Sequence, residues 1–386
     1  MQDGYILAAG PADELIRTYG PPTSEFPGCA IMPGFVNAHT HLELTHFPAW
    51  RLRGGLDYHP RRFVDWIIQM IKVRRGITEA ELRASLTAGI QASLRAGTTM
   101  VGDIITSPDL LAVYADTQLG GRLYLELLGQ DSLLFEPRLT QALTAAATIG
   151  NPRTAGLSPH APYTLHQTLL PAIAAAAGQH TLPISLHLAE SRDETDLLFD
   201  SSGPLATELY PYVGWQDYLP APRKTTPARF FDDGNLLGPA TLAVHGVQLT
   251  PADAALLKQR GVTLCLCPRS NHHLAVGTAP VHLFKKLAIP LCLGTDSLAS
   301  NDSLSLWDEI RFAVDCYRGE LGLEELLQMA TQGGARGIGM ADQAGSLDHG
   351  KRADFQVVEL KGPCTAEQLL TQGHLVDVAI AGRLLG

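Results

Sequence analysis

The sequence predicts an α/β fold: a (β/α)8 barrel of the TIM type with a small β-sandwich appendage formed by the two chain ends. Three observations lead to this prediction. Eight short apolar runs recur along the chain, nearly every run is followed by a segment with helical periodicity, and polar residues stand where the runs end. Because parallel strands need a crossover between them, usually a helix, eight such units favour a parallel sheet.

The eight runs read CAIMPGFVNAH, TTMVGD, GRLYLEL, TAGLSPH, LPISLHL, TLAVHG, VTLCLCP and IPLCLGTD. They lack the polar alternation of half-exposed strands, as expected of strands buried on both faces of a barrel. An open doubly wound sheet would call for a Gly-rich phosphate turn after the first strand, and NAHTHLEL stands there instead. Cys265 and Cys267 lie in the apolar run GVTLCLCP, so we interpret them as buried strand residues rather than as a metal motif.

The barrel is predicted over residues 31–337, and the appendage over residues 1–30 and 338–386. Both GSLDHGKRADFQVVEL and HLVDVAIAGRLLG contain short strands without a helix between them, and MQDGYILAAG is typical of one strand and a turn. Residues 59–76 predict a helix over the barrel mouth, with Phe63, Trp66 and Ile67 at core spacing. The segment 200–235, rich in Pro, Trp and Tyr, predicts a long loop that could cover a site.

Composition and net charge restrict the kinds of molecule that the protein is expected to bind. The 386 residues carry a formal net charge of -10, which argues against nucleic acid because its phosphates need clustered Lys and Arg, and favours a small-molecule substrate. No stretch reaches the ~20 apolar residues of a membrane helix, and no leader is recognisable, so a cytoplasmic protein with no membrane partner is expected. Six scattered cysteines predict reduced thiols. A homo-oligomer is compatible with the sequence, which leaves the oligomeric state open.

The residues at the strand ends predict a metal site. In such barrels the groups that act on substrates stand where strands end, and six polar residues do so here: His39, His41, His160, His187, His245 and Asp296. A lone histidine there is more often structural, but six together change that interpretation. Histidines at i and i+2 of a strand point to one side. Catalytic Zn²⁺ takes His and carboxylate ligands. We therefore expect one divalent cation held by His39, His41, His187 and Asp296.

Six motifs carry a family resemblance: MPGFVNAHTHLE, SPHAPYT, SLHLAE, AVHG, CPRSNHHL and LGTDSLASND. In this order, and over nearly the whole chain, they resemble the deaminase and chlorohydrolase branch of the amidohydrolase superfamily. The resemblance implies that Glu190 carries a proton and that His245 holds the attacking water. Two-metal members bridge their metals with a carboxylated Lys on the fourth strand. No Lys stands between Lys72 and Lys224, so one metal is expected.

The resemblance also implies a reaction. Asp296 binds the metal and accepts a proton from water, Glu190 protonates a ring nitrogen of the substrate, and ammonia leaves. Zn²⁺ is the first choice for the metal, and Fe²⁺ or Ni²⁺ are alternatives, because a His₃Asp set accepts all three. Members of the family usually have another strand before the position of Met1, so a truncated start or a reduced appendage is expected.

For the substrate we expect an adenosine-like 6-amino heterocycle that is converted to its 6-oxo product. FVDW followed by two arginines resembles members that deaminate 6-aminodeoxyfutalosine in an alternative menaquinone pathway. Arg61, Arg62, Arg74 or Arg75 could pair with its carboxylate. The residues predicted to bind substrate are His160, Asn271, Asp65 and Arg62.

The alternatives are a deaminase of S-adenosylhomocysteine or methylthioadenosine, then a guanine deaminase or a triazine chlorohydrolase. From another class, a non-catalytic metal-binding barrel is the competitor. Glu190 and His245 speak against the latter, because neither is needed merely to hold a cation.

Overall fold

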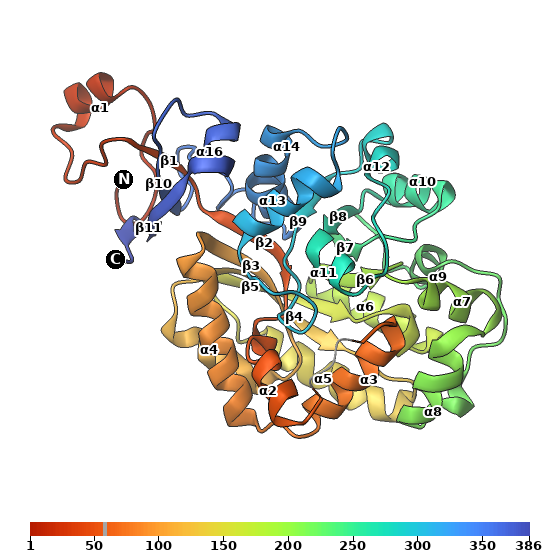
Figure 1. Cartoon of the computed structure of the whole chain (residues 1–386). Helices are drawn as coiled ribbons and strands as arrows, with labels where there is room; N and C mark the ends of the chain where they lie inside the picture. Colours follow the sequence, from red (N-terminus) through yellow and green to blue (C-terminus); the bar gives the residue numbers. More distant parts are fainter. Residues whose placement is uncertain (57–59) are drawn as a thin grey trace.

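Eight parallel strands form the predicted barrel in this computed structural model, which describes residues 1–56 and 60–386. The strands follow one another around the barrel in chain order, each paired with the next, so the α/β barrel is confirmed (Figure 1). They are β2 (Phe35–Thr40), β3 (Thr98–Ile105), β4 (Gly120–Leu127), β5 (Arg153–Pro159), β6 (Ile184–Leu188), β7 (Thr241–His245), β8 (Thr263–Leu266) and β9 (Leu291–Leu293).

Helices run between the strands and bury the outer barrel face. The principal ones are α4 (Glu79–Arg95), α5 (Ser132–Ala146), α6 (Leu170–His180), α10 (Pro251–Arg260), α12 (Val281–Lys286) and α13 (Leu306–Cys316). Thr78 and Glu81 form a capping box that fixes where α4 begins, since each side chain bonds the other residue's backbone N–H. Cys265 in β8 and Cys267 just after it are buried, as their apolar run predicts. No helix in the described part of the chain is long and apolar enough to span a bilayer.

The barrel closes between its first and last strands through side chains as well as backbone. Nδ2 of Asn37 donates to Oγ1 of Thr295 at 2.7 Å, and the backbone N–H of Thr295 donates to Oδ1 of Asn37 at 3.1 Å. One residue on, the hydroxyl of Thr40 donates to the backbone carbonyl of Asp296 at 2.9 Å, within an isolated parallel bridge. We call these contacts the seam. It fixes the height of Asp296 relative to β2.

The chain ends form the appendage, an antiparallel sheet in the order β1 (Cys29–Pro33), β10 (Phe355–Glu359), β11 (His374–Ile380) and β12 (Arg383–Leu384). Both termini lie beside it, at the upper left of Figure 1. The segment MQDGYILAAG does not form the predicted strand, because it pairs only through isolated bridges at Gln2, Tyr5 and Arg352. The helix α1 (Ala12–Tyr19) follows it and has no buried residue.

The first apolar run is two strands rather than one. β1 belongs to the appendage and β2 to the barrel, and the chain turns between them at Gly34. A Cβ atom at this position would lie 2.2 Å from Oγ1 of Thr99, so only glycine fits. The N-terminal strand of the appendage, β1, therefore extends to Pro33, beyond the boundary predicted at residue 30.

The helix predicted over the mouth is α3 (Phe63–Arg74), and His59, where the predicted segment begins, lies outside the described residues. Phe63 and Ile67 pack in a buried cluster with Leu205, Leu209 and Tyr210. These partners belong to the segment 200–235, which is helical rather than an irregular loop, with η5 (Leu205–Leu209), α8 (Tyr210–Val213), η6 (Gln216–Tyr218) and α9 (Pro227–Asp233). The two segments together cover the mouth.

Candidate metal centre and active site

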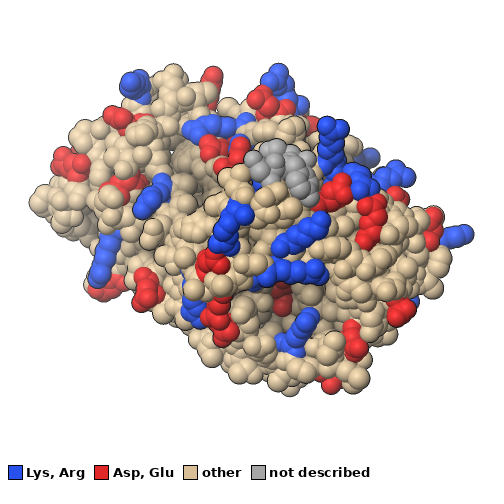
Figure 2. Space-filling model, turned by 60° about the horizontal axis from the view of Figure 1, so that its bottom comes forward, with Lys and Arg blue, Asp and Glu red and all other residues tan. Residues whose placement is uncertain are grey.

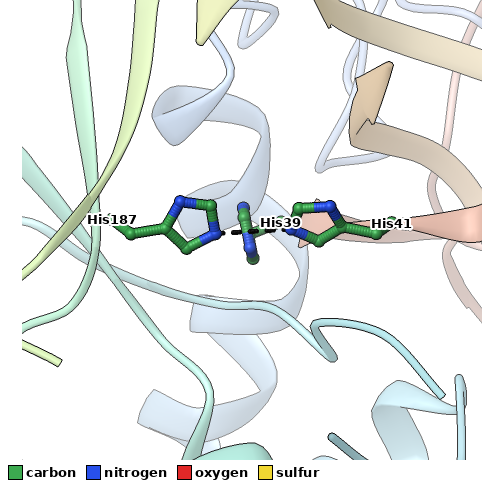
Figure 3. A group of neighbouring side chains, drawn as sticks. All are labelled: His39, His41 and His187. Atoms are coloured by element: carbon green, nitrogen blue, oxygen red, sulfur yellow. Dashed lines mark hydrogen bonds between the residues drawn. The ribbon is translucent and has the colours of Figure 1, made fainter. Parts of the chain in front are cut away.

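Three buried histidines converge at the carboxyl ends of the strands. His39 stands near the end of β2, His41 directly follows that strand, and His187 lies near the end of β6. Figure 3 shows His41 and His187 facing each other, with His39 edge-on between them. The Nε2 atoms of His41 and His187 are 3.3 Å apart, and one nitrogen from each ring lies within 4.8 Å of the others. This spacing brings together the three histidines predicted as ligands.

The free nitrogen atoms fit a cation. Both ring nitrogens of His39 are buried without a hydrogen-bond partner, which is costly unless another atom accepts the lone pair. Nδ1 of His187 lies 2.9 Å from the backbone carbonyl of His160, so it carries the proton and leaves Nε2 unprotonated. Two nitrogens bound to one zinc at about 2.0–2.1 Å and at the tetrahedral angle lie about 3.4 Å apart. The residues present therefore fit a divalent metal ion.

Asp296 completes the donor set from the other side of the seam. Its Oδ1 lies 3.6 Å from Nε2 of both His39 and His41. Its Oδ2 accepts hydrogen bonds from the hydroxyls of Ser270 at 2.7 Å and Ser300 at 2.6 Å. Burial alone would raise the pKa of this carboxyl, but the surrounding imidazoles hold it well below its ordinary value. Asp296 is therefore a carboxylate with one oxygen left for a cation.

Three residues at or just beyond strand ends have a left-handed backbone. The φ angle is 51° at Ala189, 74° at His245 and 56° at Asp296. For residues other than glycine this conformation costs on the order of 1–3 kcal/mol each, and it persists where surrounding bonds dictate it. Here the backbone N–H of Ala189 donates to Oε1 of Glu194 at 2.8 Å, and that of Asp296 donates to the carbonyl of His39 at 3.1 Å. These bonds hold the backbone where the chain leaves β6 and β9.

Glu190 is a buried acid placed to carry a proton. Its Oε1 lies 3.7 Å from Nε2 of His245. Burial raises its pKa well above the ordinary value, and the neighbouring carboxyls of Asp296 and Glu194 add to the effect. The raised pKa favours the protonated form of Glu190, which is the form that can give a proton to a substrate.

His245 is held by Asn271. Its Nδ1 lies 2.9 Å from Oδ1 of Asn271, so Nδ1 carries the proton and Nε2, which has no partner among the described residues, points toward Glu190. Burial lowers the pKa of His245 to about 4, so the ring is neutral at pH 7. Asn271 was predicted to bind substrate. The structure places it behind His245 and not on the cavity wall.

One cavity of about 690 Å³ opens at this site. At its inner end it is lined by His41, His187, Glu190, His245 and Asp296. His160, the fourth strand-end histidine, also lines it, with Nδ1 2.9 Å from the hydroxyl of Thr164. The structure thus brings His160 to the position that a substrate-binding residue needs.

Arg62 and Asp65, by contrast, lie outside the cavity. The guanidinium of Arg62 donates to Oδ1 of Asp65 at 2.7 Å and to Oε1 of Glu208 at 2.7 Å, and Arg62 is exposed. These three side chains tie α3 to η5 rather than facing a substrate. Of the other arginines considered from the sequence, Arg74 and Arg75 line the cavity, and Arg61 is exposed and does not line it.

The sequence reasoning missed two acids on the cavity wall, Glu43 and Glu126. Glu126 stands inside the apolar run LYLELL, where a charge is unexpected unless it faces a functional cavity. Glu43 follows the His-Thr-His motif by two residues. A charge within a buried strand was the signal that could have identified Glu126. The aromatic residue Trp66, predicted as core, lines the cavity too and donates from Nε1 to the carbonyl of Ala299 at 2.9 Å.

A family model, curated relatives and solved structures are similar to this chain. The model of the amidohydrolase family matches residues 30–385. The chain is 32% identical to the aminodeoxyfutalosine deaminase of Deinococcus radiodurans over 86% of this chain and 79% of that protein. It is 29% identical to the 5-methylthioadenosine/S-adenosylhomocysteine deaminase of Syntrophobacter fumaroxidans over 98% of this chain and 83% of that protein. A zinc-bound adenosine deaminase from Xanthomonas campestris has a similar structure, with a TM-score of 0.82 and 26% identity over 99% of this chain and 86% of that one.

Proposed function

The chain belongs to the amidohydrolase family, and on that basis we propose that it is a metal-dependent hydrolytic deaminase of adenosine-like compounds. The observation that carries the proposal is the pair Glu190 and His245, 3.7 Å apart, in the same cavity as three of the four expected metal ligands, His41, His187 and Asp296. A barrel that only stored a cation would need neither an acid that keeps its proton nor a neutral imidazole beside it. This pair therefore favours catalysis over simple metal binding.

His39, His41, His187 and Asp296 would hold the cation, with Zn²⁺ as the first choice and Fe²⁺ or Ni²⁺ as alternatives. The zinc in the similar adenosine deaminase structure supports this order. When bound, the cation supplies a positive charge that lowers the pKa of water and favours attack at neutral pH.

The protein's own groups then move the protons. In the proposed reaction a water adds to the carbon that bears the amino group, and Asp296 accepts a proton from that water. Glu190, which holds a proton because burial raises its pKa, gives it to the adjacent ring nitrogen. His245 orients the water through its unprotonated Nε2. Asp296 passes the proton it accepted to the amino group, which leaves as ammonia. The remaining hydroxyl proton returns to Glu190 as the carbon–oxygen bond becomes a carbonyl, so both acids regain their starting state.

For the substrate itself, we propose 6-aminodeoxyfutalosine first and S-adenosylhomocysteine or methylthioadenosine second. The relative from Deinococcus supports the first and the relative from Syntrophobacter the second. Arg74, Arg75 and Arg138 on the cavity wall suit a substrate with an anionic tail, and Trp66 and Trp215 suit an apolar one. Guanine and triazines rank below, because they are small for a cavity of about 690 Å³.

A steady-state screen tests the proposal. Purified protein is supplied with each candidate, and ammonia release is measured together with the purine absorbance. We expect turnover of at least one 6-aminopurine nucleoside. Chloride release from a chlorotriazine without turnover of any 6-aminopurine nucleoside would contradict the proposal and favour a chlorohydrolase.

A further inference from the structure

The cavity wall has further polar residues that the proposed reaction does not use. They lie at the ends of β3 and β4 and in the loop after β2, and they include Glu43, Thr106 and Glu126. Arg74 and Arg75 of α3's end and Arg138 of α5 line the cavity as well. Figure 2 brings forward the face at the bottom of Figure 1, where α3 and α5 lie, and shows basic side chains spread over its centre with acidic ones between them.

Glu43 is already satisfied by the protein. It is buried, and its Oε1 accepts a hydrogen bond from the hydroxyl of Thr106 at 2.6 Å, while Nη2 of Arg74 lies 3.8 Å away. The backbone N–H of Thr106 donates to its other oxygen at 3.3 Å. Glu43 therefore has its hydrogen-bond partners within the protein and does not need one from a ligand.

Glu126 differs in having no such partner. It lies in β4 between Leu125 and Leu127, which are buried in the core outside the barrel, so alternation turns Glu126 inward. The side chain is half-buried, lines the cavity and accepts no hydrogen bond from any residue that the structure describes. Burial raises its pKa to about 8, and the carboxyl of Glu43 adds to this, so it is mostly protonated at neutral pH. Both oxygens of Glu126 are therefore free of partners among the described residues and available to hydrogen-bond a ligand in the cavity.

The surrounding charges decide which partner fits. An ammonium group at Glu126 would face the guanidinium groups of Arg74, Arg75 and Arg138. A neutral hydroxyl group avoids this repulsion, and it donates and accepts as a protonated carboxyl does. Since Arg75 and Arg138 are exposed and Glu126 is half-buried, an anionic tail would be met at the rim and a hydroxyl group deeper in the cavity.

We propose that Glu126 determines specificity by hydrogen-bonding the pentose hydroxyls of the nucleoside substrate. The proposal rests on the proposed function and deepens it, because it assigns the part of the substrate between the purine and the tail. It makes Glu126 the reason that a ribonucleoside is preferred over a nucleoside without these hydroxyls.

The test compares four substrates: adenosine, 2′-deoxyadenosine, 3′-deoxyadenosine and 2′,3′-dideoxyadenosine. The metal-loaded protein and the variants Glu126→Leu and Glu126→Gln are assayed for kcat/KM on each. Glu136→Gln serves as the matched control, because Glu136 is an exposed carboxylate on α5 that does not line the cavity. Glu126→Ala replaces the leucine variant if the latter does not fold, as judged by a thermal melt.

We expect Glu126→Leu to lower kcat/KM for adenosine about 10- to 100-fold, the usual effect of removing a hydrogen bond to a buried acid, and to change it less than about 3-fold for the dideoxy nucleoside. Glu126→Gln should retain most activity, since an amide also donates and accepts. Equal losses on all four substrates, or a wild-type protein that does not distinguish them, would overturn the inference while the deaminase function stands. No turnover by the wild-type protein of any of the four, nor of 6-aminodeoxyfutalosine, S-adenosylhomocysteine or methylthioadenosine, would overturn the proposed function as well.

Discussion

The hydroxyl of Ser270 donates a hydrogen bond to Oδ2 of Asp296 at 2.7 Å, and Ser300 donates a second at 2.6 Å. The two bonds leave Oδ1 facing the histidines. Residues that orient ligands in this way typically contribute 10- to 100-fold in metal affinity. Ser270→Ala should therefore weaken zinc binding by about 10-fold, measured by competition with a chromophoric chelator. Ser202→Ala, at an exposed position after α7, is the control and should not change the affinity.

Metal removal provides a second prediction. The protein as purified should contain about one divalent ion per chain, because the described residues hold one group of three histidines, with Oδ1 of Asp296 3.6 Å from Nε2 of His39 and of His41. Dialysis against a chelator should abolish ammonia release, and Zn²⁺ should restore it. His39→Ala should lose the ion in elemental analysis, whereas His180→Ala, at the exposed end of α6, should keep it. Full activity after complete metal removal would contradict the assignment.

Glu190 is expected to be needed for turnover and not for metal binding. Its carboxyl does not belong to the donor set, and its raised pKa suits proton transfer. Glu190→Gln should lower kcat by about 10²- to 10⁴-fold, the usual contribution of a general acid, at unchanged metal content. Glu136→Gln is again the control. A variant with full kcat would mean that Glu190 does not carry the proton.

Asn271 gives a prediction that separates a positioning role from substrate contact. Because its Oδ1 fixes the proton on Nδ1 of His245, Asn271→Ala should allow the wrong tautomer and a rotated ring. We expect kcat to fall about 10- to 100-fold while KM changes less than about 3-fold. A large rise in KM at unchanged kcat would instead support the direct substrate contact predicted from the sequence.

Glu194 makes stability depend on pH. It is buried, and burial raises its pKa to about 8 although the backbone N–H groups of Ala189 and Glu190 oppose this. The folded protein thus binds one more proton than the unfolded chain between about pH 4.5 and pH 8, so stability falls as pH rises through this window. Relative to Glu194→Gln, the wild-type free energy of unfolding should fall by on the order of 2–4 kcal/mol across it. Urea denaturation measures this difference, and Glu136→Gln should show none.

Periodicity and strand-end polarity were enough to predict the barrel. Each of the eight strands overlaps a predicted run, and none extends more than two residues beyond it, because strands buried on both faces leave a clear apolar signal. The division of the first run at Gly34 was not visible, since β1 and β2 are both apolar and only the contact with Thr99 forces the turn. The helical nature of segment 200–235 was missed because its helices are short and gain stability from packing on α3.

For the site, the strand-end residues could be predicted because the backbone alone places them at one rim. Longer side chains could not. Arg62 bonds Glu208 in a distant segment, so its direction depends on a tertiary contact that spacing does not reveal. Asn271 stands in the loop where a substrate contact was expected, yet its side chain turns toward His245. Packing, and not position in the sequence, decides which of two neighbouring groups a polar side chain bonds.

The seam between β2 and β9 has a consequence for how the protein opens. His39 and His41 lie on one side of the seam, and Asp296 lies on the other. A shared cation would therefore cross-link the ends of the first and last strands of the barrel. Such a cross-link restrains a loop of more than two hundred residues, as a disulfide would, and it is made reversibly. Release of the ion and local fraying then become one coupled equilibrium. The amide protons of Thr295 and Asp296 would report it first, by exchanging with solvent as the metal leaves.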